Sequence, residues 1–303
     1  VLLNSAFGVA FVKALEGSGV VTTPKHFVDN YGEGGHDSYP SVTSWRVLRE
    51  VYLEPFRACF QEGGSRSVMS SYNSIDGVPV SCNGKLLNDI LKDEWGFDGY
   101  VVCDYGAVGL IHEGHYMAES HQDALAMSVN NGLDLELMNT HKGLLKLVKD
   151  GKISEDTINE SVRRILKIKF ELGLFEDPFV NEKKAAEIVR CDEHKALAEE
   201  AARKCMTLLK NDGILPLDVN KIKKIGIYGP GANQLCLGDY SGGRGGWRGE
   251  GAVNAYQGIK KAFEGKAEVV LSEIQDVNPL AESCYVLMFF PAIMQNEGSD
   301  RSS

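Results

Sequence analysis

Four short apolar runs alternate with segments of helical periodicity in the first part of the chain, and this alternation constrains the fold more than any other feature. The runs begin near residues 19, 67, 99 and 131. A repeated strand and helix pattern of this kind builds a parallel sheet covered by helices. The sequence therefore predicts an α/β fold. The regular spacing favours a TIM-type (β/α) barrel, of which about four of the eight strands are present.

The third run carries the most informative carboxylate. Tyr100 to Cys103 contain no charge, and Asp104 follows them directly. A carboxylate is costly to bury, whereas the carboxyl ends of parallel strands are where ligands and catalytic groups gather in α/β folds. Asp104 is therefore a candidate catalytic residue. The alternative is that it only caps a strand-to-helix turn.

Polar side chains also end the other three runs. They are Lys25 and His26 after the first run, Tyr72 and Asn73 after the second, and Asp134 or Glu136 at the fourth. Because the carboxyl ends of parallel strands meet at one edge of a sheet, we expect these side chains to converge around Asp104. A lone Lys or His at a strand end is more often a surface residue, so this expectation depends on the shared edge.

The composition excludes several classes of function. Hydrophobic residues make up 43% of the chain and charged residues 24%, as in a globular protein with a sizeable core. The formal net charge of −10 argues against a nucleic-acid partner. No apolar run reaches the roughly 18 residues that a membrane span needs. The seven cysteines form no Cys-x-x-Cys pair, which favours packing residues over a zinc site.

A polar stretch from about residue 176 to 192 predicts a linker, and a second α/β pattern follows it. The apolar run Lys224 to Tyr228 leads into Gly229-Pro230-Gly231-Ala232. This loop lacks the third glycine of a dinucleotide-binding fingerprint, so we expect no such site here.

Several segments, in the same order along the chain, resemble glycoside hydrolase family 3, the β-glucosidase and β-xylosidase family. The matching segments are Thr23–Phe27, Ser67–Asn73, Gly96–Val108, Leu208–Leu217 and Glu297–Arg301. The resemblance implies three regions. Residues 1–178 would be the C-terminal part of a (β/α)-barrel catalytic domain, 179–207 a linker and connecting helix, and 208–303 the N-terminal part of an α/β sandwich domain.

The resemblance also implies roles for single residues. Asp104 matches the catalytic nucleophile, and Glu297 matches the general acid/base, which the second domain carries. No metal and no organic cofactor is implied. The residues that match substrate-binding positions are Lys25, His26, Met69, Tyr72 and Tyr105, the last on the leaving-group side.

The implied activity is that of a retaining exo-acting glycoside hydrolase that releases a terminal β-linked sugar by double displacement. A β-D-glucoside is the first expectation, with a β-D-xyloside or an α-L-arabinofuranoside as alternatives. Such chemistry needs two carboxyl groups about 5–5.5 Å apart, one ionised and one protonated. A cation such as Lys25 would favour ionised Asp104, and desolvation would keep Glu297 protonated.

Some residues depart from the family pattern, and two other functions remain open. Cys103 stands where Ser is usual, and Gln295-Asn296 precedes Glu297 where Glu-Gly is common. One alternative is a catalytically inert carbohydrate-binding fragment. The other is a β-N-acetylhexosaminidase, which is disfavoured because Tyr39 stands where those enzymes need a His.

The expected partner is an oligosaccharide or glycoside, with neither nucleic acid nor membrane, and homo-oligomerisation stays open. The chain begins at Val1 without a leader and lacks counterparts of the early barrel strands. We therefore expect a fragment that lacks the first part of the barrel and the last part of the second domain. Cytoplasmic, periplasmic and secreted locations all remain open.

Overall fold

The computed structural model describes residues 1–31, 37–138, 140–235, 252–272 and 278–292. The chain divides into two compact units, Val1–Val180 and Asn181–Ser303, and each unit has its own hydrophobic core. Among the described helices, none combines the length and the apolar character that a membrane span requires.

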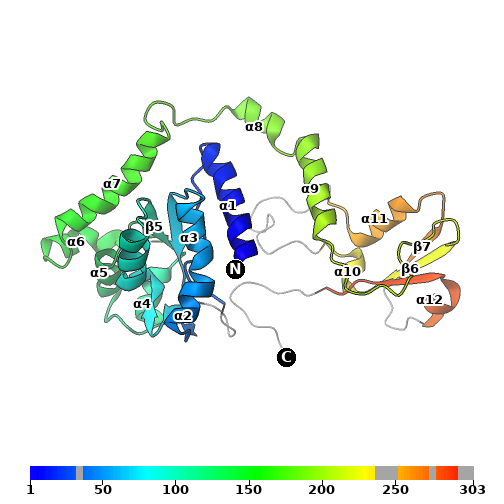
Figure 1. Ribbon diagram of the computed structural model, residues 1–303, viewed down its shortest axis with the longest axis horizontal. Helices are drawn as coiled ribbons and strands as arrows, with labels where there is room; N and C mark the ends of the chain where they lie inside the picture. Colours follow the sequence, from blue (N-terminus) through cyan, green and yellow to red (C-terminus); the bar gives the residue numbers. More distant parts are fainter. Residues whose placement is uncertain (32–36, 139, 236–251, 273–277, 293–303) are drawn as a thin grey trace. The chain divides into compact units, whose positions relative to one another are not determined.

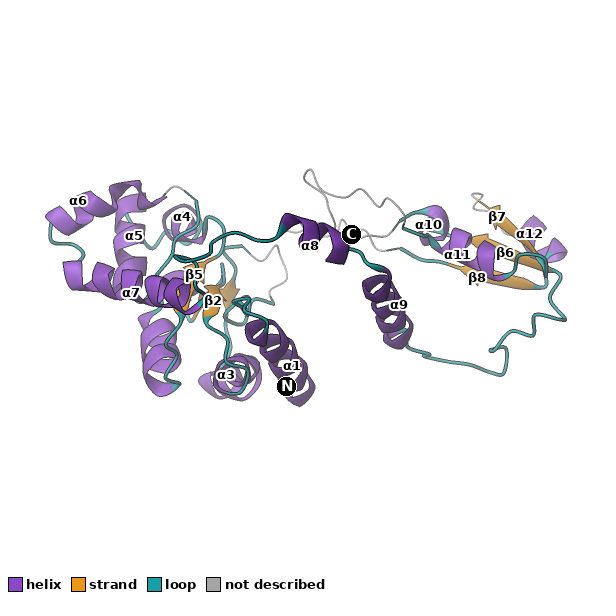
Figure 2. Cartoon of the chain, turned by 90° about the horizontal axis from the view of Figure 1, so that it is seen from above, coloured by secondary structure: helices purple, strands orange, loops and turns teal. Residues whose placement is uncertain are grey.

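A parallel pair of strands, β2 (Ser67–Ser70) and β5 (Tyr100–Cys103), forms the centre of the first unit (Figure 2). Met69 lies opposite Val102, one step before the strands end. Gly99 permits this close approach, because a Cβ at that position would lie 2.1 Å from the carbonyl oxygen of Arg66. The two strands therefore end side by side, as the predicted parallel sheet requires.

Extended backbone continues this sheet on both sides. Phe27 N–H donates to the Met69 carbonyl at 2.8 Å, and Met69 N–H donates to the Pro24 carbonyl at 3.2 Å. Beyond β5, Leu135 forms a parallel bridge with Val102. The four predicted runs thus lie next to one another in chain order, which gives the first unit the architecture of part of a (β/α) barrel. The outer two form isolated bridges instead of full strands.

Helices surround this sheet (Figure 1). Their bounds are α1 Leu2–Gly17, α2 Trp45–Val47, α3 Glu54–Gln61, η3 Lys85–Glu94, α4 Ala107–Glu113, α5 His121–Asn130, α6 Leu144–Lys149 and α7 Glu155–Glu171. Short 3-10 helices lie at η2 Val80–Cys82 and η4 Thr140–Gly143. Three two-residue strands, β1 Pro40–Ser41, β3 Ser74–Ile75 and β4 Val78–Pro79, form a small separate sheet.

The helical segment from residue 44 to 61 is interrupted. At its start the Ser44 hydroxyl accepts the N–H of Val47 at 3.3 Å. A π-helical turn, η1 (Leu48–Tyr52), then precedes α3. Pro55 stands in the first turn of α3, and proline has no N–H with which to continue the preceding helix. The helix therefore restarts at Glu54.

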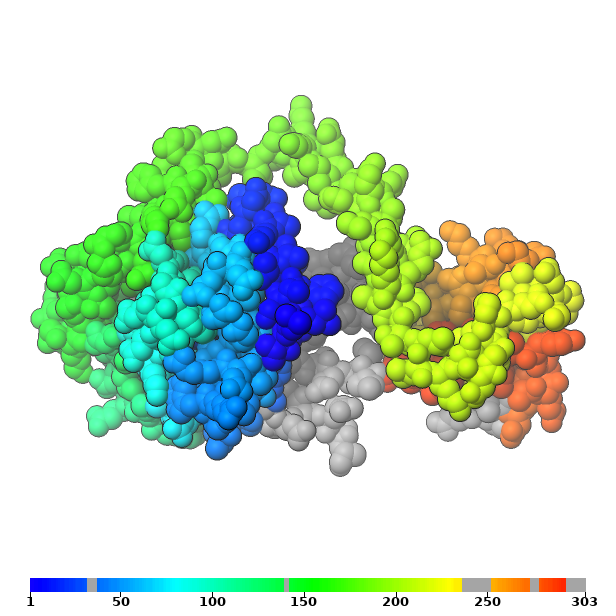
Figure 3. Space-filling view, in the orientation of Figure 1, coloured from blue at the N-terminus to red at the C-terminus, as the bar shows by residue number. Residues whose placement is uncertain are grey.

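Helix α1 packs one face against α3 and leaves the other exposed. Gly8 permits the contact, since a Cβ there would lie 2.7 Å from the Sγ atom of Cys59. Figure 3 shows α1 in dark blue on the surface of the first unit. Its exposed apolar side chains are Leu2, Leu3, Phe7 and Phe11.

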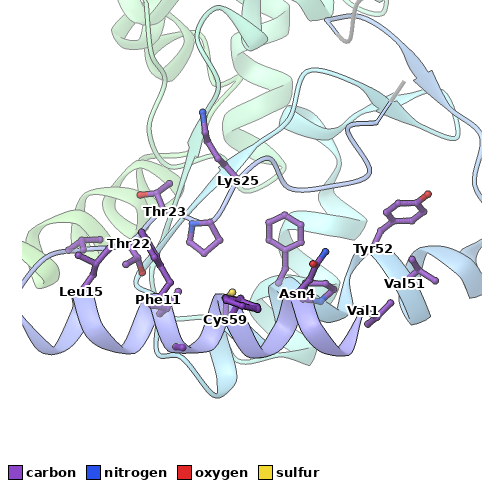
Figure 4. A pocket seen from close by; sticks show the side chains of 18 of the residues that line it. Val1, Asn4, Phe11, Leu15, Thr22, Thr23, Lys25, Val51, Tyr52 and Cys59 are labelled. Atoms are coloured by element: carbon purple, nitrogen blue, oxygen red, sulfur yellow. The ribbon is translucent and has the colours of Figure 1, made fainter. Parts of the chain in front are cut away.

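A cavity of about 1180 Å³ lies between α1, the segment 21–25 and residues of η1 and α3 (Figure 4).

The second unit is built on a three-stranded parallel sheet in the order β7–β6–β8. The strands are β6 Lys224–Tyr228, β7 Glu268–Ser272 and β8 Val286–Phe289. Gly226 is required at the centre, because a Cβ there would lie 2.7 Å from the side chains of both Leu280 and Leu287. The helices of this unit are α8 Glu182–Ile188, α9 Asp192–Cys205, α10 Pro230–Asn233, α11 Ala255–Ala262 and α12 Asn278–Ser283.

Candidate active site

Asp104 lies at the carboxyl end of β5 and is 7% exposed. Its N–H donates to the Ser70 carbonyl at 3.2 Å, which extends the pairing of β2 and β5 by one residue. Its Oδ1 atom accepts the main-chain N–H of Tyr105 at 2.7 Å. The carboxylate is therefore held by the backbone on one oxygen, at the edge of the sheet where the strands end.

The imidazole of His26 is the basic group beside this carboxylate. Its Nε2 atom lies 3.1 Å from Oδ2 of Asp104, although no described residue gives Oδ2 a well-aligned hydrogen bond. Burial alone would raise the pKa of Asp104. The interactions with His26 and the Tyr105 N–H outweigh burial, and the pKa lies below its ordinary value. The site thus favours an ionised carboxylate at neutral pH. The basic residue beside the carboxylate is His26, whereas Lys25 was predicted to have this role.

Tyr72 reaches the same point from the end of β2. Its phenol donates a hydrogen bond to the carbonyl oxygen of Tyr105 at 2.9 Å and also contributes to the lowered pKa of Asp104. The side chain of Tyr105 is 65% exposed. The main-chain N–H and carbonyl groups of Tyr105 therefore both form hydrogen bonds, while its ring faces solvent.

Asn73 ties the segment that carries His26 to the end of β2. Its Nδ2 atom donates to the carbonyl oxygens of Val28 at 3.3 Å and Asp29 at 3.1 Å, and Asn73 is fully buried. The buried Asp29 carboxylate in turn accepts the hydroxyl of Ser41. These bonds fix the turn after His26, and so they fix where the imidazole lies.

Lys25 and Met69 lie near this cluster in different ways. Lys25 is exposed and borders the cavity beside α1, where Figure 4 shows its side chain extending from the end of the segment Thr22–Pro24. Met69 is half-buried on β2, where it is the residue before the last one of the strand. Glu297 lies outside the described residues.

The fourth run was expected to contribute Asp134 or Glu136. Asp134 does not converge with Asp104, so that alternative is wrong, and the one with Glu136 stays a prediction. Its carboxylate accepts the N–H of Val101 and the hydroxyl of Ser161, each at 2.9 Å. Lys92 Nζ lies 3.5 Å from it, and Asp134 has a 3% exposed side chain. Val101 is near the start of β5, so Asp134 belongs to a structural network at the opposite end of the strand.

The surroundings of Cys103, which precedes Asp104, make its thiol unreactive. Cys103 is fully buried, and its Sγ accepts the N–H of Leu137 at 3.2 Å. Burial raises the pKa of this thiol to about 12. The thiol therefore stays neutral and adds no charge beside the carboxylate. In the part of the chain that the structure describes, no cluster of His, Cys, Asp and Glu could hold a metal ion.

Two features of the cluster have no signal in the side-chain pattern. One is the pair of hydrogen bonds by which Asn73, itself expected at this edge, holds the carbonyl groups of Val28 and Asp29. The other is His115, whose Nε2 lies 2.8 Å from the carbonyl oxygen of Tyr72. Both act on main-chain carbonyl groups, which every residue carries, so side-chain patterns alone gave no signal for them.

The fold and the cluster define an α/β protein of the (β/α)-barrel class with a carboxylate at the end of a barrel strand. The chain belongs to glycosyl hydrolase family 3. The family model described as the N-terminal domain matches residues 2–168, and the model of the C-terminal domain matches residues 206–303. The fold is accordingly part of a TIM-type barrel followed by part of an α/β sandwich, as the sequence predicted.

Curated relatives and solved structures agree with this assignment. A β-xylosidase of Formosa agariphila is 38% identical over 79% of this chain and 37% of its own length. A β-glucosidase structure from Erythrobacter marinus has a TM-score of 0.84 at 31% identity, covering 93% of this chain and 43% of that one. A Listeria innocua β-glucosidase in complex with isofagomine has a TM-score of 0.83 at 30% identity, covering 95% and 42%. The chain thus spans less than half the length of each of these relatives.

Proposed function

We propose that this chain is part of a retaining, exo-acting β-glycosidase in which Asp104 is the nucleophile. The observation that carries the proposal is the carboxylate at the end of β5, with Oδ1 bound to the Tyr105 N–H and Oδ2 3.1 Å from His26. This arrangement supports an ionised carboxylate that is fixed in place, and both properties are needed for attack on an anomeric carbon.

The mechanism that we propose has two displacements. In the first, an oxygen of Asp104 forms a bond to the anomeric carbon while Glu297 gives its proton to the departing glycosidic oxygen. In the second, Glu297 takes a proton from water, and the water oxygen displaces Asp104 from the same carbon. Each step inverts the configuration, so the net result is retention. Lys25, His26, Met69 and Tyr72 would hold the sugar that is released, and Tyr105 would border the leaving group.

The substrate that we propose is a terminal β-D-glucoside, with a β-D-xyloside as the second choice and an α-L-arabinofuranoside as the third. The printed names of relatives support the first two, since they include β-glucosidases and β-xylosidases. Those names give no support to a β-N-acetylhexosaminidase. A carbohydrate-binding fragment without turnover is also less favoured, because the relatives' printed names are those of glycosidases.

The test is covalent trapping on the full-length protein. A 2-deoxy-2-fluoro-β-glucoside with an activated leaving group should inactivate the enzyme, and peptide mass analysis should place the label on Asp104. Asp104→Asn should take up no label and should lose roughly 10³-fold or more of kcat, as removal of a nucleophile does. Label on another carboxylate, or turnover by Asp104→Asn near the wild-type rate, would overturn the assignment.

A further inference from the structure

Tyr72 is bound at two points by the segment that follows the proposed nucleophile. Its phenol donates to the carbonyl oxygen of Tyr105 at 2.9 Å, and its own carbonyl oxygen lies 2.8 Å from Nε2 of His115. Tyr105 comes directly after Asp104, and His115 comes just after α4. The segment 105–115 therefore holds Tyr72 at its hydroxyl and at its main chain.

The turn that carries His115 is itself well fixed. The N–H groups of Gly114 and His115 donate to the Leu110 carbonyl at 2.9 and 2.8 Å. A Cβ at Gly114 would lie 2.9 Å from the Cβ of Ser38, so the turn packs tightly against residue 38. Tyr116 has a φ of 54°, a left-handed conformation that a non-glycine residue keeps only when its surroundings impose it. His115 is thus presented to Tyr72 by a rigid support.

The protonation of His115 follows from its partner. A carbonyl oxygen only accepts, so Nε2 of His115 must carry the proton and donate it. Burial lowers the pKa of His115, and the ring is therefore neutral at pH 7. The imidazole acts as a hydrogen-bond donor without adding a positive charge near Asp104.

We propose that His115 is a positioning residue of this site, which aims the phenol of Tyr72 at Tyr105 and Asp104 by holding the Tyr72 carbonyl. The proposal rests on the proposed function of Asp104. If the bond to His115 is lost, the main chain of Tyr72 is free to shift. A displacement of about 1 Å in a positioning group can reduce the rate of a reaction roughly 10²-fold.

His112, in α4, offers a control close to His115. Its Nδ1 lies 2.9 Å from the carbonyl oxygen of Ala118, it is half-buried like His115, and its ring also contacts that of His121. The two histidines therefore make the same kind of bond from the same helical region. Only the bond of His115 leads to Tyr72, so His112→Leu measures the structural cost of losing one such bond.

The experiment compares His115→Leu, His115→Gln and His112→Leu in the full-length protein. His115→Leu should lower kcat about tenfold or more with KM for an aryl glycoside nearly unchanged. His115→Gln should restore most of kcat, because its amide nitrogen can reach the position of Nε2. His112→Leu should keep the wild-type kcat. Equal losses in the two Leu variants, or no rescue by Gln, would overturn the positioning role.

Nitration of Tyr72 by tetranitromethane, followed by peptide mass analysis, gives a readout that does not need activity. His115→Leu should accelerate nitration of Tyr72 severalfold, whereas His112→Leu should not. Unchanged nitration in His115→Leu would overturn the proposal. If the wild-type protein hydrolyses no glycoside, the proposed function fails, and the nitration rates still report whether His115 holds Tyr72.

Discussion

Nε2 of His26 lies 3.1 Å from Oδ2 of Asp104, and the two residues reach this distance from different extended segments of one sheet. From the sequence, Lys25 was predicted to be the cation that favours ionised Asp104. In the structure the adjacent His26 provides the partner, and the interaction lowers the pKa of Asp104 against the opposing effect of burial. The pKa of Asp104 therefore depends on the hydrogen bonds that hold the turn after His26.

Replacing His26 with Leu should move the acid limb of kcat/KM to higher pH. In the proposed mechanism Asp104 attacks as a carboxylate, so activity falls as the pH drops through its pKa, and loss of His26 should raise that pKa toward its ordinary value. The contact of His26 with Oδ2 is an ion-pair distance without a well-aligned hydrogen bond and should be worth about 0–1 kcal/mol, so kcat/KM on the acid limb should fall about fivefold or less. The pH–rate profile with an activated aryl glycoside is the measurement. An acid limb at the wild-type position would show that His26 does not set the charge of Asp104.

Glu297→Ala should slow substrates with poor leaving groups far more than activated aryl glycosides, because the latter need little proton assistance. General acid catalysis contributes roughly 10²–10⁴-fold, and this is the expected difference between the two substrate types. Azide should restore part of the rate and yield a β-glycosyl azide. If both substrate types slow equally and azide has no effect, Glu297 takes part only in binding.

Lys25→Met should weaken catalysis with little effect on folding. Lys25 is an exposed residue at the end of a strand-like segment, so its loss removes little packing. As a surface ion pair it would be worth about 0–1 kcal/mol. If Lys25 instead binds the sugar in the transition state, its loss should lower kcat/KM by a factor that corresponds to several times this free energy. Measuring kcat/KM and Tm together on the full-length protein separates these cases, and a near-wild-type kcat/KM rules out the sugar-binding role.

Asp134→Ala should destabilise the first unit without impairing the chemistry of folded molecules. The substitution leaves buried Lys92 and the Val101 N–H without their acceptor. Removing one partner of a buried pair costs about 3–5 kcal/mol. The control is Asp98→Ala, which breaks an exposed pair with Lys167 and should cost less than about 1 kcal/mol. Urea unfolding supplies the free energies, and equal losses in both variants would contradict the structural role of Asp134.

The order of the elements could be predicted because local signals agreed with the fold. The uncharged run before Asp104 predicts a buried strand, and this run is β5. The positions of the predicted strand ends also put His26, Tyr72 and Asp104 at one edge of the sheet. In the structure these three residues do lie together at that edge.

The remaining differences come from tertiary contacts that have no local signature. The sequence of residues 131–137 reads as a strand, but Asp134 turns to the start of β5 because Lys92 and Ser161 hold it there. A bond from a side chain to a distant carbonyl, such as the bond of His115, leaves no periodicity to detect.

The hydrogen bond from the Tyr105 N–H to Asp104 has an evolutionary consequence, because it comes from the main chain. Every amino acid except proline supplies the same donor at this position. The exposed ring of Tyr105 can thus be exchanged for other side chains while the hold on Asp104 is kept. Under the proposed roles of Asp104 as nucleophile and Tyr105 beside the leaving group, position 105 is a place where a lineage, or a saturation library, can sample new leaving-group preferences at little risk to the nucleophile.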